Sequence, residues 1–108
     1  MSEILNYFTF QDVATVVLEG NEYKNDCADS ITFEISGTSV SRTIVFEGLS
    51  LSGAWYPIQC ANLSTITFAS QTNGSGELWQ VDISGLLRFR TRISAVSGGN
   101  ITIKGKVV

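Results

Sequence analysis

The stretch that decides the fold of this chain is Ser30-Ile31-Thr32-Phe33-Glu34-Ile35-Ser36, in which apolar and polar side chains alternate without a break. Successive side chains of a β-strand point to opposite faces, so the apolar residues of this stretch share one face and the polar residues share the other. The pattern predicts a strand of an antiparallel sheet that covers a core on one side and meets water on the other.

The same alternation, with a period of two residues, recurs along the rest of the chain, and helical periodicity is absent. In residues 87–93 the apolar side chains fall on one face and three arginines fall on the other. Further alternating runs occupy residues 13–18, 41–47, 54–60, 64–69, 77–83 and 101–107. About eight strands are therefore expected, with essentially no helix.

Short segments rich in glycine and serine separate these runs. Gly37-Thr38-Ser39 predicts a short hairpin, whereas Ser84-Gly85 is so brief that the flanking strands are expected to meet at a corner. Pro57 has no N–H to donate to a ladder, which places its run at a sheet edge or a bulge. Turns every ~8–12 residues are typical of a sandwich or jelly roll. We therefore predict an all-β, jelly-roll-like antiparallel sandwich with a core that contains Phe33, Phe46, Trp79 and Phe89.

The length of 108 residues suits a single domain with one core. We expect residues 13–108 to form that domain and residues 1–12 to be an N-terminal edge strand or arm. The aromatic stretch Tyr7-Phe8-Thr9-Phe10 needs cover, which its own sheet or a neighbouring subunit could provide.

The composition excludes several classes of protein. Charged residues make up 16% of the chain and its net charge is -3, which argues against a nucleic-acid partner bound by phosphate neutralisation. No apolar run approaches the ~18 residues of a membrane span, so no membrane partner is expected. The first residues lack the basic start and apolar stretch of a signal peptide, and we expect synthesis in the cytosol.

Catalytic side chains are scarce. The chain has no histidine, which removes the usual general acid–base group and every Ser-His-Asp or Cys-His arrangement. Glu34 and Glu47 could form a pair of carboxylates, but both lie on polar strand faces, where simple solvation is the better interpretation. Asp26 and Asp29 lack the spacing of a calcium loop. We expect no enzymatic activity, no cofactor and no metal site.

The two cysteines, Cys27 and Cys60, have neither a CxxC spacing nor a histidine near them. In a reducing compartment two free thiols are favoured over a disulfide. Neither cysteine is expected to be a metal ligand or a nucleophile.

The arginine stripe of Arg88, Arg90 and Arg92 is the most informative polar feature. Three guanidinium groups on one strand face repel one another unless acidic or aromatic groups lie beside them. One interpretation is pairing with acids on neighbouring strands, and the other is binding of a subunit or an anionic glycan. The acids considered for such pairing are Glu34, Glu47 and Asp82.

Trp55 and Tyr56 form a second candidate surface. Adjacent strand residues point to opposite faces, so at most one of the two belongs to the core. The other would be partly exposed near Pro57, where an aromatic ring can stack on a sugar or fill a pocket of another subunit.

Charge is distributed unevenly along the chain. Acidic residues crowd the first third, and every charged residue after Asp82 is basic. These charges can pair across strands within one domain. Alternatively, an acidic flank of one copy can meet a basic flank of the next, which favours repeated assembly.

Several segments together carry a resemblance to a known class of protein. In chain order they are Phe33-Glu34-Ile35-Ser36-Gly37, Thr43-Ile44-Val45-Phe46-Glu47-Gly48, Trp55-Tyr56-Pro57-Ile58, Val81-Asp82-Ile83-Ser84-Gly85-Leu86 and Phe89-Arg90-Thr91-Arg92-Ile93-Ser94-Ala95. With Ser97-Gly98-Gly99 and Ile101-Thr102-Ile103 they span roughly residues 30–104. The sequence resembles small β-rich virion proteins of tailed bacteriophages and prophages.

This resemblance implies a structural or attachment role on the particle, such as capsid decoration, fibre, neck, tail or baseplate, without a catalytic site. The protein would be made in the bacterial host cytoplasm and found in the virion. We therefore expect a non-enzymatic virion component that forms oligomers and docks onto other virion proteins. The alternative is a carbohydrate-binding module of a tail fibre or baseplate that recognises a cell-surface glycan through Trp55 or Tyr56.

Overall fold

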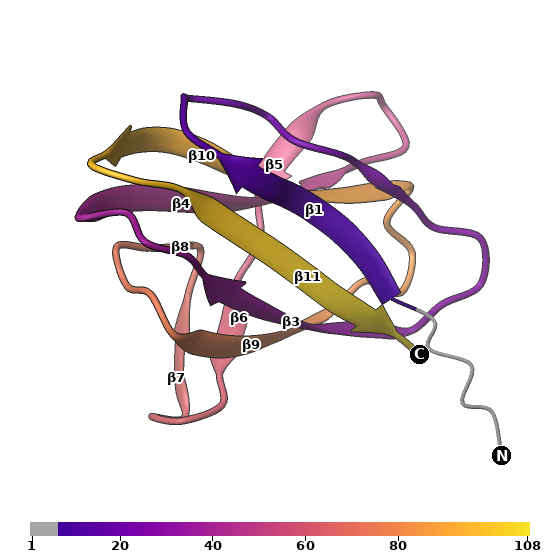
Figure 1. Cartoon of the computed structure of the whole chain (residues 1–108). Helices are drawn as coiled ribbons and strands as arrows, with labels where there is room; N and C mark the ends of the chain where they lie inside the picture. Colours follow the sequence, from indigo (N-terminus) through magenta and orange to yellow (C-terminus); the bar gives the residue numbers. More distant parts are fainter. Residues whose placement is uncertain (1–6) are drawn as a thin grey trace, which may run out of the picture.

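The computed structural model describes residues 7–108, which fold into two antiparallel β-sheets packed face to face (Figure 1). This arrangement confirms the all-β antiparallel sandwich predicted from the sequence. No helix forms in the described range, and hence none with the length and apolarity of a membrane span.

The larger sheet has six strands in the order β1-β11-β3-β9-β6-β7. Their bounds are β1 Tyr7–Ala14, β11 Ile101–Val107, β3 Ser30–Ser36, β9 Glu77–Asp82, β6 Cys60–Asn62 and β7 Thr67–Ala69. The alternating stretch that defines the fold is β3, which pairs with β11 on one side and β9 on the other. Its three apolar side chains are fully buried because the strand lies inside the sheet and faces the second sheet.

The smaller sheet has the order β2-β10-β4-β5, with the short strand β8 also paired to β4. Its strands are β2 Tyr23–Lys24, β10 Arg88–Ser97, β4 Ser41–Leu49, β5 Trp55–Pro57 and β8 Gln71–Thr72. Pro57 lies on the edge strand β5, as the missing N–H predicted. The total exceeds the expected eight strands because several strands of only two or three residues, such as β2 and β8, are too short to show alternation.

Aromatic rings from the two sheets meet in the core. The Phe33 ring centroid lies 5.3 Å from that of Phe46 and 5.9 Å from that of Phe89, and Phe46 lies 4.9 Å from Trp79. All four residues are buried, as predicted. Because aromatic pairs of this kind add to the effect of apolar burial, they hold the two sheets in a fixed relation.

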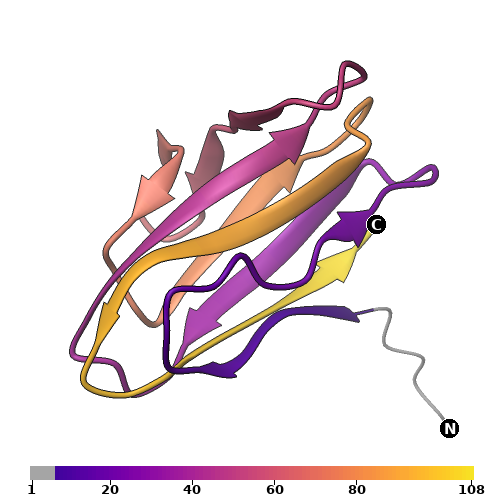
Figure 2. The ribbon, with the colours of Figure 1, turned by 90° about the horizontal axis from the view of Figure 1, so that it is seen from above.

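The predicted hairpin at residues 37–39 is wrong. β3 and β4 belong to different sheets, so this segment carries the chain across the sandwich. It lies beside the crossing from β10 to β11, where Ser39 N–H donates to the Asn100 carbonyl oxygen at 3.0 Å and Val40 N–H to that of Ser97 at 2.9 Å (Figure 2). Alternation of apolar and polar residues identifies a strand but not its partner strand. Turn residues occur both in hairpins within a sheet and in connections between two sheets, so they do not tell these apart. The corner expected at Ser84-Gly85 is confirmed, since it joins β9 to β10 in the other sheet.

Three predicted strands also need correction. The strand expected at residues 54–60 is divided between β5 and the start of β6, which belong to different sheets. The strand expected at residues 13–18 does not form, because β1 ends at Ala14 and Val13 adopts a φ of 52°. Only an isolated bridge between Leu18 and Ile93 follows. The strand expected at residues 64–69 is reduced to β7, and its apolar residues Ile66 and Phe68 are exposed. Phe68 pairs with Ala61 on the side of the hairpin opposite to the buried Cys60, and Ile66 lies in the turn before β7, so alternation there does not lead to burial.

The N-terminal segment, as far as it is described, is part of the sandwich. β1 pairs with β11, and the buried Phe10 ring lies 6.2 Å from Phe33 and 5.8 Å from Phe89. Phe8 to Gln11 therefore find cover in their own chain, whereas Tyr7 at the start of β1 is 56% exposed. Residues 1–6 of the predicted edge strand or arm lie outside the described residues.

Candidate functional site

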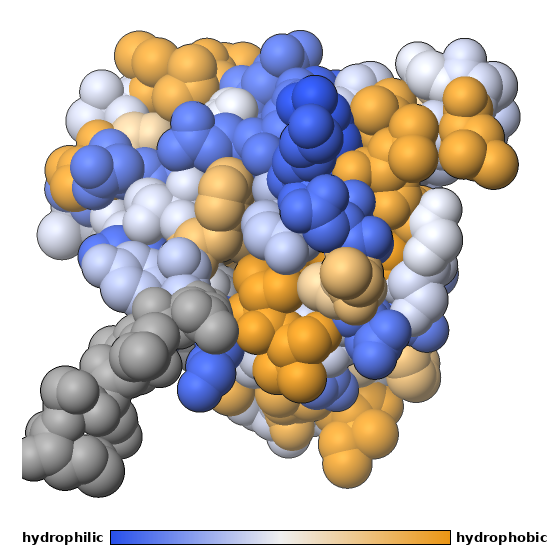
Figure 3. Space-filling model, turned by 90° about the vertical axis from the view of Figure 1, so that its right-hand side faces the viewer, coloured by the Kyte–Doolittle hydropathy of each residue, from blue (hydrophilic) through white to orange (hydrophobic). Residues whose placement is uncertain are grey.

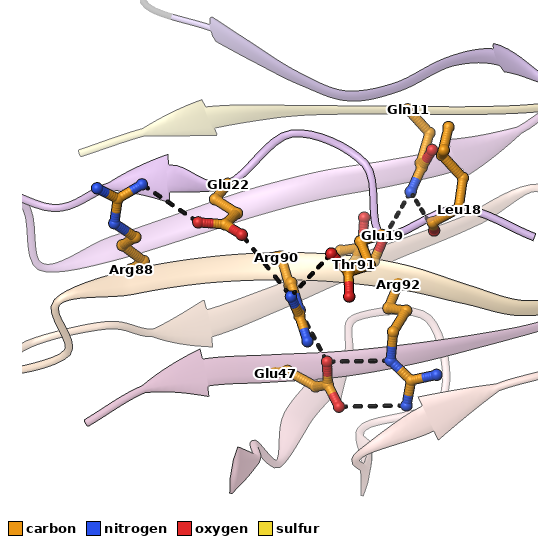
Figure 4. Close-up of polar contacts among 9 residues, drawn as sticks. All are labelled: Gln11, Leu18, Glu19, Glu22, Glu47, Arg88, Arg90, Thr91 and Arg92. Carbon is orange, nitrogen blue, oxygen red and sulfur yellow. Dashed lines mark hydrogen bonds and ion pairs between the residues drawn. The ribbon is translucent and has the colours of Figure 1, made fainter. Parts of the chain in front are cut away.

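The outer face of the five-stranded sheet carries the predicted arginine stripe (Figure 4). Alternation along β10 turns Phe89, Thr91 and Ile93 into the core and leaves the three arginines outside it. A short loop between β1 and β2 and the edge strand β5 flank this face. The arginines are therefore partly covered and do not project freely into solvent.

Glu47 of β4 lies between two of the arginines. Arg90 stands opposite Glu47 in the register of β10 and β4, and its Nε donates to Glu47 Oε1 at 2.8 Å. Arg92 binds the same carboxylate with two donors, Nε at 3.1 Å from Oε1 and Nη2 at 3.2 Å from Oε2. Charge-assisted bonds of this geometry are stronger than neutral ones.

The surroundings of Glu47 shift its pKa in two opposing ways. Burial raises it, but the hydrogen bonds and positive charges of Arg92 and Arg90 outweigh burial and hold the pKa below its ordinary value. The same hydrogen bond raises the pKa of the Arg92 guanidinium. Glu47 therefore remains an ionised carboxylate, held in place by Arg90 and Arg92.

Arg90 is enclosed from its other sides as well. Its guanidinium carbon lies 3.9 Å from the Trp55 ring centroid, a cation–π contact, and its side chain is only 9% exposed. Arg90 Nη1 lies 3.6 Å from Glu19 Oε1 and 3.7 Å from Glu22 Oε2. Arg88 Nη1 in turn donates to Glu22 Oε1 at 3.2 Å.

Three arginines and three glutamates thus form one cluster of zero net charge, which we call the arginine cluster: Arg88, Arg90, Arg92, Glu19, Glu22 and Glu47. Of the three acids predicted as partners, only Glu47 is one. Glu34 and Asp82 belong to strands of the other sheet and cannot reach the stripe. Glu19 and Glu22 belong to the acidic first third of the chain, whose charges are expected to pair with the later basic residues or with another copy, but neither is predicted as a partner of the stripe because the loop that carries them follows a predicted strand.

Gln11 fixes that loop to the sandwich. Its buried side-chain Nε2 donates to the Thr91 carbonyl oxygen at 2.8 Å and to the Leu18 carbonyl oxygen at 3.3 Å. The amide therefore joins β1 of one sheet to β10 of the other and holds the segment just before Glu19. A buried amide that binds two backbone carbonyls gives the loop a defined position, and with it the arginine cluster.

Trp55 and Tyr56 differ in their exposure, as strand alternation requires. Trp55 is half-buried and stacks on Arg90, so its ring face is already occupied. Tyr56 is 55% exposed beside Pro57. The pair therefore offers one free aromatic ring.

The other residues considered for catalysis or metal binding do not come together in a site. Glu34 and Glu47 lie on the outer faces of different sheets, with the core between them, and cannot act as a pair of carboxylates. Cys27 is exposed and Cys60 is buried, and both are free thiols. Burial raises the pKa of the Cys60 thiol. Within residues 7–108 no three His, Cys, Asp or Glu residues gather in a metal-binding group.

The comparison with known proteins gives the family. The model of the XepA family matches residues 5–107. The chain belongs to the XepA family. Among the relatives in Bacillus subtilis (strain 168), the SPbeta prophage-derived protein YomS is 34% identical over 101 residues, which cover 94% of this chain and 85% of YomS. The XepA protein of the phage-like element PBSX is 33% identical over 101 residues, which cover 94% of this chain and 36% of that protein.

Crystal structures of both relatives have the same fold as this member of the XepA family. The structure of the SPBc2 prophage-derived protein YomS superposes with a TM-score of 0.88 at 32% identity over 94% of this chain and 91% of that chain. The structure described as the PBSX exported protein XepA gives 0.92 at 32% identity, and covers 94% of this chain but 37% of that chain. The chain thus matches nearly all of YomS and about a third of XepA. The resemblance to phage and prophage proteins is confirmed.

Proposed function

We propose that this chain is a non-enzymatic component of a phage or prophage particle, which acts by self-association and by docking onto other virion proteins. It would be made in the bacterial cytoplasm and incorporated into the virion. Support comes from membership of the XepA family, whose members include proteins of a prophage and of a phage-like element. The arrangement of the polar groups adds a second argument.

The arginine cluster favours a structural role for the polar face. Its positive and negative charges cancel within the cluster, and Arg90 is covered by Trp55. An anionic ligand would have to displace Glu47, which two arginines already bind. The arginines therefore stabilise the sheet, and recognition of other proteins falls to other parts of the surface.

The observation that carries the proposal is the grouping of exposed apolar side chains. Val16, Val17 and Leu18 are exposed in succession, and the β6–β7 hairpin exposes Leu63, Ile66 and Phe68. Figure 3 shows one end of the molecule, where apolar surface lies in clusters between hydrophilic side chains. Single exposed apolar residues are common, whereas groups rimmed by polar residues mark protein–protein contacts.

Particle association tests the proposal directly. Particles of the phage or prophage that encodes the chain would be purified on a density gradient and their proteins quantified by mass spectrometry. We expect the chain to sediment with the particles in a fixed ratio to the capsid or tail proteins. Recovery only in the soluble fractions would contradict a place in the virion, and a strict monomer at high concentration in analytical ultracentrifugation would contradict self-association.

A second candidate function is binding of a cell-surface glycan, and the exposed ring of Tyr56 favours it. An aromatic ring beside Pro57 on an edge strand is free to stack on a sugar. A glycan array tests this candidate. Specific binding that is lost in Tyr56→Ala and kept in Leu51→Ala, a change at an exposed turn residue, would support it; an array without specific binding would contradict it.

A further inference from the structure

The connection between β8 and β9 has the sequence Asn73-Gly74-Ser75-Gly76 and carries the chain from one sheet to the other. Asn73 is the one asparagine of the sequence that is followed by glycine. Its side chain is exposed, as are Ser75 and Gly76, so solvent water reaches the loop. In an asparagine–glycine pair the backbone nitrogen of the glycine has an open approach to the side-chain amide, because no side chain obstructs it.

Strand β4 supplies a hydrogen-bond donor to each carbonyl group of Asn73. Thr43 Oγ1 donates to the side-chain Oδ1 at 3.0 Å, and Arg42 Nη1 donates to the backbone carbonyl oxygen at 2.9 Å. The guanidinium of Arg42 is held in place by Ser39, since Nε donates to Oγ at 2.7 Å and Nη2 to the carbonyl oxygen at 2.6 Å. Arg42 forms no ion pair among residues 7–108. Its charge is therefore available to a new carboxylate.

The backbone nitrogen of Gly74 lies at the start of a chain of hydrogen bonds that ends at a carboxylate. Gly74 N–H donates to Thr72 Oγ1 at 3.1 Å, and Thr72 Oγ1 donates to Glu77 Oε1 at 2.7 Å. Trp79 Nε1 also donates to Glu77 Oε1, at 3.1 Å, and a Cβ at Gly74 would collide with this carboxylate. A backbone N–H is a weak nucleophile until its proton is removed, and a hydroxyl bound to a carboxylate can accept that proton.

We propose that Asn73 and Gly74 form a succinimide in the folded chain, and that Arg42 directs its hydrolysis to isoaspartate. The Gly74 nitrogen attacks Asn73 Cγ and forms the N–Cγ bond. The N–H proton passes to the Thr72 hydroxyl, whose own proton passes to the Glu77 carboxylate. The attacking and attacked groups belong to neighbouring residues, so the reaction is intramolecular and needs no enzyme.

The tetrahedral adduct at Cγ then loses ammonia. Its negative charge lies on Asn73 Oδ1, where the hydrogen bond from Thr43 Oγ1 stabilises it. The carbonyl forms again as the Cγ–Nδ2 bond breaks, and the amide nitrogen leaves as ammonia with the proton that Glu77 received. The product is a five-membered imide that joins the Gly74 nitrogen to both carbonyl carbons of residue 73.

Water opens the imide at one of these two carbonyl carbons, and the nitrogen takes back a proton as its bond to that carbon breaks. Attack at Cγ gives aspartate at position 73. Attack at the backbone carbonyl carbon gives isoaspartate, in which the main chain runs through Cγ and the former backbone carbonyl becomes a free carboxylate. Arg42 already contacts that carbonyl oxygen, so it polarises the group and then pairs with the carboxylate. The charged donor outweighs the neutral donor Thr43, and isoaspartate is the main product.

Peptide mapping by mass spectrometry of the chain, kept folded at pH 8 for several weeks, tests the reaction. The other asparagines on the same map are internal references, and Asn73→Gln, which would have to close a larger ring, is the control variant. We expect position 73 to convert from amide to acid at least about tenfold faster than any other asparagine. Thr72→Val and Glu77→Gln should slow the conversion at least about threefold, whereas Thr72→Ser keeps the hydroxyl and should keep the rate.

Digestion with endoproteinase Asp-N, which cleaves before aspartate but not before isoaspartate, measures the two products. We expect the ratio of isoaspartate to aspartate to be at least about twofold higher in the folded chain than in the chain unfolded in guanidinium chloride. Arg42→Gln should lower the ratio to that of the unfolded chain, and Arg42→Lys, which keeps the charge, should lower it less. Circular dichroism shows that each variant is folded.

Three results would overturn the inference. A folded chain that keeps its amide at position 73 as long as at the other asparagines would exclude the reaction. Faster conversion in Thr72→Val would show that the hydrogen bond holds the Gly74 nitrogen back. An equal product ratio in the folded and unfolded chains would remove the role of Arg42. The reaction lies within one chain, so none of these results depends on association with a particle.

Discussion

The Glu47 carboxylate accepts a 2.8 Å hydrogen bond from Arg90 at the centre of the outer face of the five-stranded sheet. Both side chains are largely buried, although they lie outside the core, because Trp55 covers one of them. A buried ion pair adds little to stability compared with an apolar pair, but removal of one partner leaves a charge without compensation. Glu47 is thus the residue on which the arginine cluster depends most.

Replacement of Glu47 by glutamine should lower the free energy of unfolding by about 2–3 kcal/mol. The amide keeps one oxygen as acceptor but loses the charge that compensates Arg90 and Arg92, while Glu19 and Glu22 still lie near Arg90. Urea denaturation measures the change. The control Glu34→Gln, at an exposed site on the other sheet, should stay within about 0.5 kcal/mol of the unchanged chain, and an equal loss in both variants would contradict the role of the cluster.

The stability should also fall in acid because of Glu47. Its pKa in the folded chain lies below the ordinary value, so the unfolded chain binds the proton more readily. The contribution of Glu47 is complete above the unfolded pKa of about 4.3 and is lost as the pH falls through the folded pKa. Denaturation midpoints measured between about pH 5 and pH 3 should therefore decline, with a shallower decline in Glu47→Gln than in Glu34→Gln. Equal slopes would exclude Glu47 as a source of the acid sensitivity.

Gly20 and Gly53 provide a matched pair of substitutions. Both adopt a positive φ, 77° and 84°, so alanine is strained at either site by about 1–2 kcal/mol. At Gly20 a Cβ would also collide with the Gln11 amide and the Phe10 carbonyl oxygen, whereas at Gly53 nothing lies within 4 Å. Gly20→Ala should therefore cost at least about 1 kcal/mol more than Gly53→Ala in urea denaturation. An equal cost would show that the Gln11 amide does not hold the loop.

The sequence predicts the strands better than their connections, and the reason is physical. Alternation reports which side chains of a strand are buried, and it correctly placed Phe33 and Phe89 in the core. It does not report which strand is the partner, so Gly37-Thr38-Ser39 predicts a hairpin where the chain crosses between the sheets. For the same reason, only the part of the arginine cluster that lies on strands could be predicted. Glu47 lies on a strand beside Arg90, whereas Glu22 reaches it through a loop that Gln11 places by long-range contacts.

The two cysteines should react very differently in the native protein. Cys27 is exposed, while Cys60 is buried and burial raises the pKa of its thiol, which leaves little thiolate. A thiol reagent such as DTNB at pH 8 should label one thiol per chain rapidly and two after denaturation. Cys27→Ser should show no rapid labelling. Rapid labelling of both thiols in the unchanged chain would indicate that the sheet opens at β6, next to the edge strand β7.

Ile66 should be a site at which substitution stabilises the chain. This β-branched residue has a φ of 54°, and the turn that imposes it is held by Asn62, whose carbonyl oxygen accepts the Ile66 N–H at 2.8 Å and whose side chain accepts the Ser64 N–H at 3.0 Å. A β-branched residue in this conformation costs on the order of 1–2 kcal/mol, and Ile66 is 81% exposed, so it gains little from burial in return.

Asparagine tolerates the left-handed conformation, and Ile66→Asn should therefore raise the free energy of unfolding by about 1 kcal/mol and the melting temperature by roughly 4–8 °C. Ile66→Val keeps the branched Cβ and should leave both unchanged. A stability gain in both variants, or in neither, would show that the backbone at Ile66 is not strained. A gain in Ile66→Asn accompanied by weaker self-association would mean that the chain keeps an unfavourable conformation to present an apolar side chain at the tip of the β6–β7 hairpin, two residues before Phe68.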